Sequence, residues 1–230
     1  MTWVWENLDL IGRLSLEHVR LSVPPIVLGL LFAVPIGWLA YRFRFVRPAI
    51  LTVVGLLYTI PSLALFVILP VVLGVGFLSE INVTVALTIY AVAILVRSVT
   101  DAFGAVSPEV RQAATAMGYS GWSRFWVVEL PLAGPVVLAG LRVVAVSTVS
   151  LVTVGIFVGV QSLGYLFVNG LQRTIFAEVA AGLVMTVVIA LVFDALLVLL
   201  GRVLLPWTRL DSRRAVRAAA STTTTEGATR

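Results

Sequence analysis

Three residue types that serve much of enzyme chemistry are absent or nearly absent from this sequence. It contains no cysteine and no lysine, and His18 is its only histidine. Disulfide bonds, thiolate metal sites and cysteine nucleophiles are therefore excluded. Without lysine, the chain also lacks the Gly-x-x-x-x-Gly-Lys loop with which many ATPases hold phosphate. A single histidine argues against a histidine-rich metal cluster or a serine–histidine pair, so we expect no catalytic residue and no metal site.

Charge is also scarce. Charged residues make up 12% of the chain and hydrophobic residues 60%, whereas a soluble domain carries about 25% charged residues. Because about 20 apolar residues span a bilayer core, uncharged runs of this length predict membrane helices. We therefore expect an all-α, polytopic membrane helix bundle with about five transmembrane helices. The predicted spans are residues 21–41, 48–79, 81–96, 132–160 and 179–205.

The arginines that flank these runs predict the orientation of the chain. Twelve of the sixteen follow the first, third and fifth runs, and only Arg13, Arg20 and Arg173 fall on the opposite side. Since basic residues concentrate on the cytoplasmic side of membrane proteins, the N-terminus is predicted outside and the C-terminus inside. The membrane flanks account for the basic net charge, and we expect no nucleic-acid partner.

This topology divides the chain into three parts. Residues 1–20 form an external N-terminal segment, which would put His18 at the outer surface. Residues 21–205 form the transmembrane domain. Residues 206–230 form a cytoplasmic tail, which is predicted to be disordered because its polar composition cannot bury an apolar core.

One cytoplasmic loop, residues 107–131, carries the pattern of two short helices. Ser107-Pro108-Glu109 is a helix start, with an N-cap residue, a proline in the first turn and an acid beside it. Gly118 is predicted to end this helix, and Pro131 to end the second. The second helix carries three aromatic residues, Trp122, Phe125 and Trp126. On physical grounds the pair is either a docking surface or an amphipathic hairpin that lies on the bilayer.

The same loop resembles a known motif. Gln112-Ala113-Ala114-Thr115-Ala116-Met117-Gly118, followed by Glu129-Leu130-Pro131, is similar to the EAA loop of ABC importer permeases. Three further segments narrow the resemblance to the permeases of osmoprotectant importers, which carry glycine betaine, carnitine and choline. These segments are Thr59-Ile60-Pro61-Ser62-Leu63-Ala64-Leu65, Val128-Glu129-Leu130-Pro131-Leu132-Ala133 and Ala139-Gly140-Leu141-Arg142. The resemblance runs from about Leu21 to Arg202.

This resemblance implies a permease subunit that performs no covalent chemistry and holds no cofactor of its own. Its implied partners are a cytoplasmic ATPase dimer that binds ATP and Mg²⁺, a second copy or a paralogous permease, an external solute-binding protein and the lipid bilayer of a bacterial cell membrane. A quaternary amine is the implied solute, with an amino acid or a related betaine as the alternative. A self-contained carrier or membrane enzyme is disfavoured, because no nucleophile–base set accompanies Asp101, Arg142 and Asp194.

The resemblance also assigns residues to the ATPase contact. They are Gln112, Ala113, Ala114, Gly118, Trp122, Glu129 and Pro131. Three positions depart from the family pattern: Gln112 replaces a glutamate, Tyr58 stands where this branch has glutamine, and Gln161-Ser162-Leu163-Gly164 replaces a more glycine-rich segment. The amide of Gln112 can still form hydrogen bonds, so the ATPase contact is expected to be weakened or retuned rather than lost.

Two sets of residues inside the spans are further candidates. Pro61 would kink its span and free a carbonyl that Thr59 or Ser62 could satisfy, which indicates either a hinge in the solute pathway or a structural kink. Arg142 and Asp194 lie at matching depth on two predicted antiparallel helices, about 11 to 12 Å from the same side. Because an unpaired charge inside a membrane is costly, we predict an intramembrane ion pair. The alternative is that one of the two charges meets the solute.

Overall fold

The computed structural model describes residues 2–76 and 79–207, and every regular element in these ranges is helical. Four helices are long and apolar enough to cross a membrane, or five if a bent pair counts as one span. The expectation of an all-α bundle with about five spans is thus confirmed. The predicted disordered tail lies outside the described residues, apart from residues 206 and 207.

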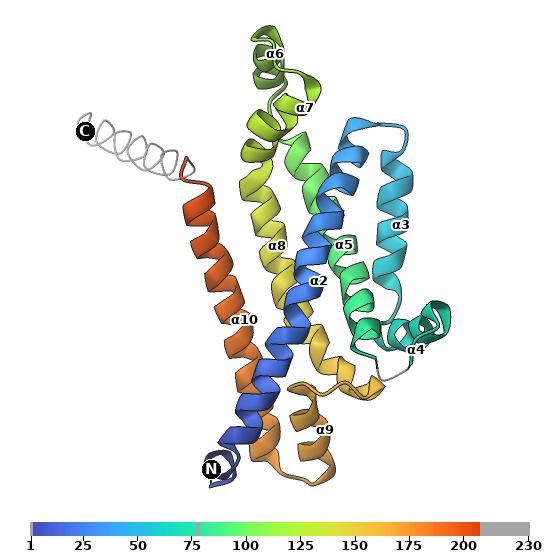
Figure 1. Ribbon diagram of the computed structural model, residues 1–230, viewed down its shortest axis with the longest axis vertical. Helices are drawn as coiled ribbons and strands as arrows, with labels where there is room; N and C mark the ends of the chain where they lie inside the picture. Colours follow the sequence, from blue (N-terminus) through green and yellow to red (C-terminus); the bar gives the residue numbers. More distant parts are fainter. Residues whose placement is uncertain (1, 77–78, 208–230) are drawn as a thin grey trace, which may run out of the picture.

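The helices follow one another with short connections. Their bounds are α1 Thr2–Glu6, α2 Leu8–Arg42, α3 Arg47–Thr59, α4 Ser62–Leu73, α5 Glu80–Gly104, α6 Pro108–Ala116, α7 Gly121–Arg124, α8 Leu130–Val152, α9 Gly164–Gln172 and α10 Phe176–Leu204. A π-helical turn, Phe125–Glu129, joins α7 to α8, and a 3₁₀ turn, Thr153–Val158, follows α8. In Figure 1, α6 and α7 project at one end, and the N-terminus and α9 lie at the other.

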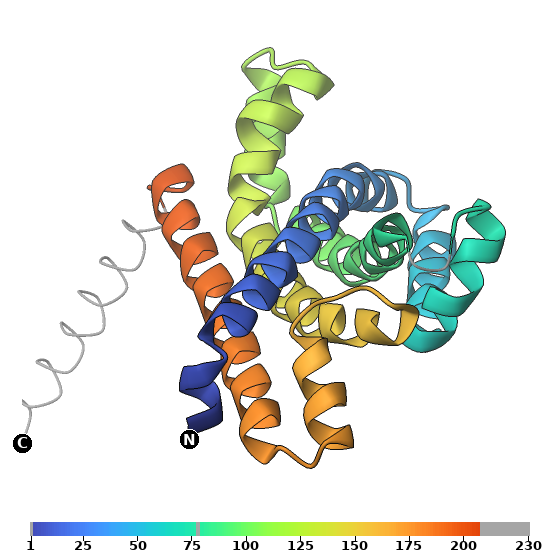
Figure 2. The same ribbon diagram turned by 60° about the horizontal axis from the view of Figure 1, so that its bottom comes forward.

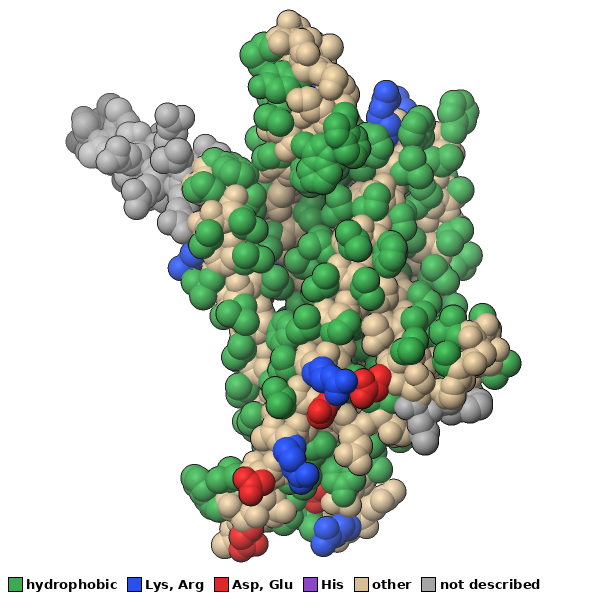
Figure 3. Space-filling model, in the orientation of Figure 1, with side chains coloured by type: hydrophobic (Ala, Val, Ile, Leu, Met, Phe, Trp, Pro, Cys, Tyr) green, Lys and Arg blue, Asp and Glu red, His purple; other side chains and the backbone are tan. Residues whose placement is uncertain are grey.

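Helices α2, α5 and α8 form the centre of the bundle, with α10 on one side and α3 and α4 on the other (Figures 1 and 2). The flank of the molecule in Figure 3 is largely hydrophobic, as expected for a surface that faces lipid. Two glycines bring α2 close to α5: a Cβ on Gly29 would lie 2.5 Å from Cβ of Ala91, and one on Gly37 would lie 2.6 Å from Cγ1 of Val99. Small residues at these positions allow the two backbones to approach.

Helix α2 begins at Leu8, well before residue 21, where the first span was predicted to start. Residues 8–20 therefore continue the first long helix and do not form a separate segment. The prediction that His18 lies on the surface is wrong, because its side chain is fully buried against α8 and its Nε2 lies 2.9 Å from the carbonyl oxygen of Val149. Helix α9, which follows the predicted fourth span, was not predicted.

The second predicted span consists of two helices. Helices α3 and α4 meet at Ile60 and Pro61 with a bend of 104°, so the uncharged run is a broken span or a re-entrant loop. Proline at the start of α4 lacks the N–H that would continue the α3 ladder. Helix α4 ends at Leu73, and Gly74 follows it with a positive φ of 66°.

The prediction that Pro131 ends a short helix is wrong. The chain stays helical from Gly121 to Val158, and Pro131 lies in the first turn of α8. Just before it, the N–H of Leu130 donates to the carbonyl of Phe125, which is the wider hydrogen-bond spacing of a π turn. A proline this close to a helix start removes no donor that the following α-helix needs.

Candidate functional site

The projecting α6 begins and ends where the sequence indicates. Ser107 occupies the N-cap position and Pro108 the first helical position. The Ser107 hydroxyl donates to the carboxylate of Glu109 rather than capping the backbone, and this hydrogen bond lowers the pKa of Glu109. Gly118 has a φ of 86°, a left-handed conformation that stops the helix after Ala116 at low cost in strain.

Only part of the predicted ATPase-contact set is available at the surface of this chain. Gln112, Ala113, Gly118 and Trp122 are exposed, and Pro131 is half-buried. Ala114, by contrast, lies on the inward side of α6 and is buried. Ala114 therefore packs against its own chain, and its assignment to the ATPase contact stays a prediction.

Glu129 is also withdrawn from the surface, because its side chain is only 5% exposed and is held by two arginines. Arg124 Nε lies 2.8 Å from Glu129 Oε1, and Arg111 Nε lies 3.8 Å from the same oxygen. Arg124 also donates to the Thr115 hydroxyl at 2.8 Å. We call Arg111, Arg124 and Glu129 the Glu129 clamp. Because Arg111 and Thr115 belong to α6, the clamp fastens α6 to the start of α8.

The other side of the clamp contacts the spans. The guanidinium of Arg111 donates to the carbonyl of Phe103 on α5 and lies 4.8 Å from the ring centroid of Tyr41 on α2. Phe125 packs beside it, with ring centroids 5.4 Å from Trp38 and 5.6 Å from Phe103. Sequence reasoning missed the roles of both arginines, because the partners of Arg111 come from three separate helices.

The candidate pathway residues gather at the break between α3 and α4. The Thr59 hydroxyl donates to the carbonyl of Leu56 at 2.7 Å, within its own helix. Thr59 and Pro61 are exposed, and Ser62 is half-buried. Sequence reasoning also missed Tyr90, whose hydroxyl donates to the Ile60 carbonyl in the break.

Asn82 ties the middle of α4 to α5. Its side chain is fully buried and its Nδ2 donates to the carbonyl of Phe66 at 2.7 Å. The sequence gives one signal for this contact, which is that Asn82 is a polar amide at the start of the uncharged run 81–96. The break and the middle of α4 are thereby both tied to α5.

Arg142 and Asp194 lie together on α8 and α10. Arg142 Nε is 2.6 Å from Asp194 Oδ1, and a second nitrogen is 2.7 Å from Oδ2. This two-point geometry is the strongest form of an arginine–carboxylate contact. With each charge engaged by the other, the pair has the arrangement of a structural link between the two spans.

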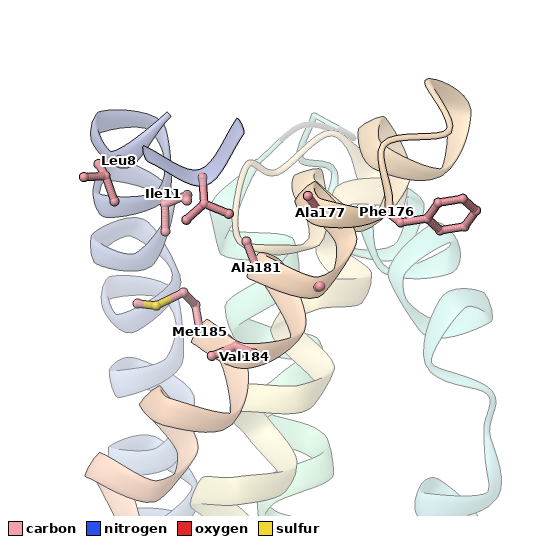
Figure 4. Close-up of a pocket in the computed structure, with 9 residues that line it drawn as sticks. Leu8, Ile11, Phe176, Ala177, Ala181, Val184 and Met185 are labelled. Atoms are coloured by element: carbon pink, nitrogen blue, oxygen red, sulfur yellow. The ribbon is translucent and has the colours of Figure 1, made fainter. Parts of the chain in front are cut away.

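An apolar groove lies at the opposite end of the molecule from α6. It has a volume of about 550 Å³ and lies between the start of α2 and the start of α10. In Figure 4, Leu8 and Ile11 from α2 face Ala181 and Met185 from α10. Its lining supplies no polar side chain to orient a solute. Among the described residues, no group of three histidine, aspartate or glutamate side chains could hold a metal ion.

Residues 19–210 match the family described as the binding-protein-dependent transport system inner membrane component. The chain is 30% identical over 209 residues to the osmoprotectant import permease protein OsmW of Salmonella typhimurium strain LT2, which covers 89% of this chain and 96% of the relative. It is 31% identical over 191 residues to the choline transport system permease protein OpuBB of Bacillus subtilis strain 168, covering 83% and 86%.

Solved structures share the same fold. The inward-facing MetNI methionine ABC transporter matches with a TM-score of 0.75 at 20% identity, over 86% of this chain and 98% of that one. An amino acid ABC transporter with histidines matches with a TM-score of 0.67 at 15% identity, over 87% and 97%. At these identities the likeness concerns the fold alone.

Proposed function

Because this chain belongs to the family of binding-protein-dependent transport system inner membrane components, we propose that it conducts a small osmoprotectant of the quaternary-amine class. As a member of this family it is a non-catalytic, multi-pass permease subunit of an ABC transporter, and a separate ATPase hydrolyses ATP. The proposed solute class rests on relatives whose names specify osmoprotectants, glycine betaine, carnitine and choline.

The assembly that we propose has four kinds of component. Two permease subunits, identical or paralogous, form the pathway, and two ATPases bind ATP and Mg²⁺ on the cytoplasmic side. An external binding protein delivers the solute at the end that holds the N-terminus. The arginine distribution supports this orientation, because it puts α6 and the C-terminal end of α10 on the basic, cytoplasmic side.

The observation that carries the coupling role is the projection of α6 beyond the bundle, with an exposed face and a fixed base (Figure 1). Gln112, Ala113 and Trp122 supply the exposed face that we assign to the ATPase. The Glu129 clamp supplies the base. A force on α6 is then transmitted to α8, α5 and α2 through charged and aromatic contacts rather than through a flexible linker.

The test compares two identical substitutions at the same end of the molecule. Ala113→Arg places a long cation on the exposed face of α6, whereas Ala105→Arg places it in the exposed turn between α5 and α6. We expect Ala113→Arg to abolish co-purification with the cognate ATPase and stimulated ATP turnover in proteoliposomes, while Ala105→Arg retains both. Wild-type ATP turnover in Ala113→Arg would refute the assigned face.

The solute class has its own measurement. Proteoliposomes that contain the permease, the ATPase and the binding protein should accumulate labelled choline, glycine betaine or carnitine in the presence of ATP. Accumulation of a neutral amino acid with none of the three amines would refute the proposed solute while leaving the coupling role intact.

A further inference from the structure

The break between α3 and α4 lies deep in the membrane. At about 1.5 Å per residue, Thr59 is about 18 Å along α3 from Arg47, which is more than half of a hydrocarbon core of about 30 Å. Thr59 and Pro61 are nevertheless exposed on this chain. Non-helical backbone at such depth is stable only against protein or water. This surface therefore faces another subunit or an aqueous path, and not lipid.

A pair of tyrosines stands at this break. Tyr58, the last residue but one of α3, is 56% exposed, and its ring centroid lies 6.1 Å from that of Tyr90 in an edge-to-face arrangement. Tyr90 is buried on α5, and its hydroxyl is engaged by the carbonyl of Ile60. The buried ring is thus held by a carbonyl of the break, and it makes an edge-to-face contact with the exposed ring.

The surroundings determine what such a ring can bind. Residues 48–76 contain no charged residue, so a permanent cation at this depth meets no carboxylate on α3 or α4. A quaternary ammonium group has no N–H and cannot donate a hydrogen bond to the carbonyls of the break. The face of an aromatic ring attracts such a cation through its quadrupole, and it needs neither a proton nor a counter-charge.

We propose that Tyr58, held in place by Tyr90, binds the quaternary ammonium head of the solute as it passes the broken span. This inference rests on the proposed function, since it takes the solute to be a quaternary amine. A single exposed ring gives modest affinity, which suits a pathway, because a solute that binds there must also leave. The site determines specificity by favouring a methylated cation over a neutral solute of similar size.

Fluorination of the ring tests this electrostatic attraction directly. Tyr58→Phe removes the hydroxyl, and 4-fluoro-, 3,5-difluoro- and 3,4,5-trifluorophenylalanine at position 58 then withdraw electrons from the ring face with little change in size. In proteoliposomes of the full transporter, we expect kcat/KM for labelled choline uptake to fall stepwise along the series. The total loss should be about two- to thirty-fold, the range that corresponds to one cation–π contact.

The matched control is the same series at Phe45, which is 98% exposed in the connection between α2 and α3. Choline uptake should be constant across that series. Constant uptake across the series at position 58 overturns the proposal. The proposal is also overturned if Tyr58→Leu weakens subunit assembly while fluorination has no effect on uptake. Tyr58 would then be a contact between subunits.

Failure of the proposed function gives a different result. If the wild-type transporter takes up no quaternary amine but accumulates another solute, the solute class is wrong and the binding site for its cation is refuted with it. If wild-type uptake of choline is normal and the fluorination series is flat, only the role of Tyr58 is refuted.

Discussion

Replacing Glu129 by alanine should loosen α6 without disturbing the rest of the bundle. The carboxylate is the shared partner of Arg111 and Arg124, and its loss leaves two guanidinium groups facing each other across a largely buried gap. The clamp holds α6 through side chains at one place, where Arg111 and Thr115 meet Glu129 and Arg124. The effect should therefore be local.

The expected magnitude follows from the burial of the three side chains. Removing one partner of a buried ion pair costs about 3 to 5 kcal/mol. Arg111 and Arg124 are 16% and 24% exposed, so water recovers part of their solvation and the cost falls to or below the lower end of that range. We expect a loss of about 2 to 3 kcal/mol in the local opening free energy of α6. This corresponds to backbone amide exchange that is about 30- to 150-fold faster.

Hydrogen–deuterium exchange on the subunit in lipid nanodiscs measures this loss. Amides of α6 report the effect, and amides of α9, at the far end of the molecule, provide the internal reference. Glu129→Gln retains the shape and an acceptor oxygen, and it should give an intermediate rate. An α6 rate within about threefold of wild type, or equal acceleration in α9, would contradict the clamp.

Two further predictions concern contacts between spans. Arg142→Gln and Asp194→Asn should each lower the stability of the solubilised subunit, because each single change leaves one partner of the two-point contact unpaired. The double variant should lose less stability than the sum of the two single losses. Strictly additive losses in chemical unfolding would refute the coupling. Gly29→Ala should destabilise the subunit by about 1 to 3 kcal/mol, since its Cβ would lie 2.5 Å from Cβ of Ala91. Gly55→Ala, whose Cβ would meet no atom within 4 Å, should be neutral or slightly stabilising in the same thermal unfolding assay. Equal losses for the two alanine variants would contradict the close approach of α2 and α5.

The spans could be predicted from the sequence because the bilayer penalises charge wherever it occurs. The first and last residues of the helices could not be predicted in the same way. A charged residue marks where contact with lipid ends, and a helix can continue past it. Glu17 and Arg20 illustrate this: both lie on α2, and they pair with each other at 3.1 Å within the helix. The run of uncharged residues therefore started late, at residue 21, while the helix starts at Leu8.

Proline was the least predictable residue, since its effect depends on its position in the hydrogen-bond ladder. Pro61 separates two helices by 104°, whereas Pro131 sits in the first turn of α8 and interrupts nothing. The sequence around each proline does not distinguish these outcomes. Pairings between distant segments were equally hidden, as for His18, whose partner Val149 is 131 residues away.

A pair of charges at the same depth in the membrane is easier to predict from the sequence. Arg142 and Asp194 could be matched because both distances to the membrane surface can be counted along the chain. The contact face of α6 could be predicted only in part, because a nine-residue helix must turn one side inward and the motif does not say which alanine that is. The structure gives Ala114 this inward place and leaves Ala113 outside.

The link between Arg142 and Asp194 also has a consequence for biosynthesis. The two residues are 52 positions apart, and the arginine is made first. At about 5 to 20 residues per second, Arg142 precedes its carboxylate by about 3 to 10 s. During this interval α8 is a span with an uncompensated cation, which the insertion machinery must retain until α10 emerges. A nascent chain that stops before residue 194 therefore leaves Arg142 of α8 without its carboxylate partner.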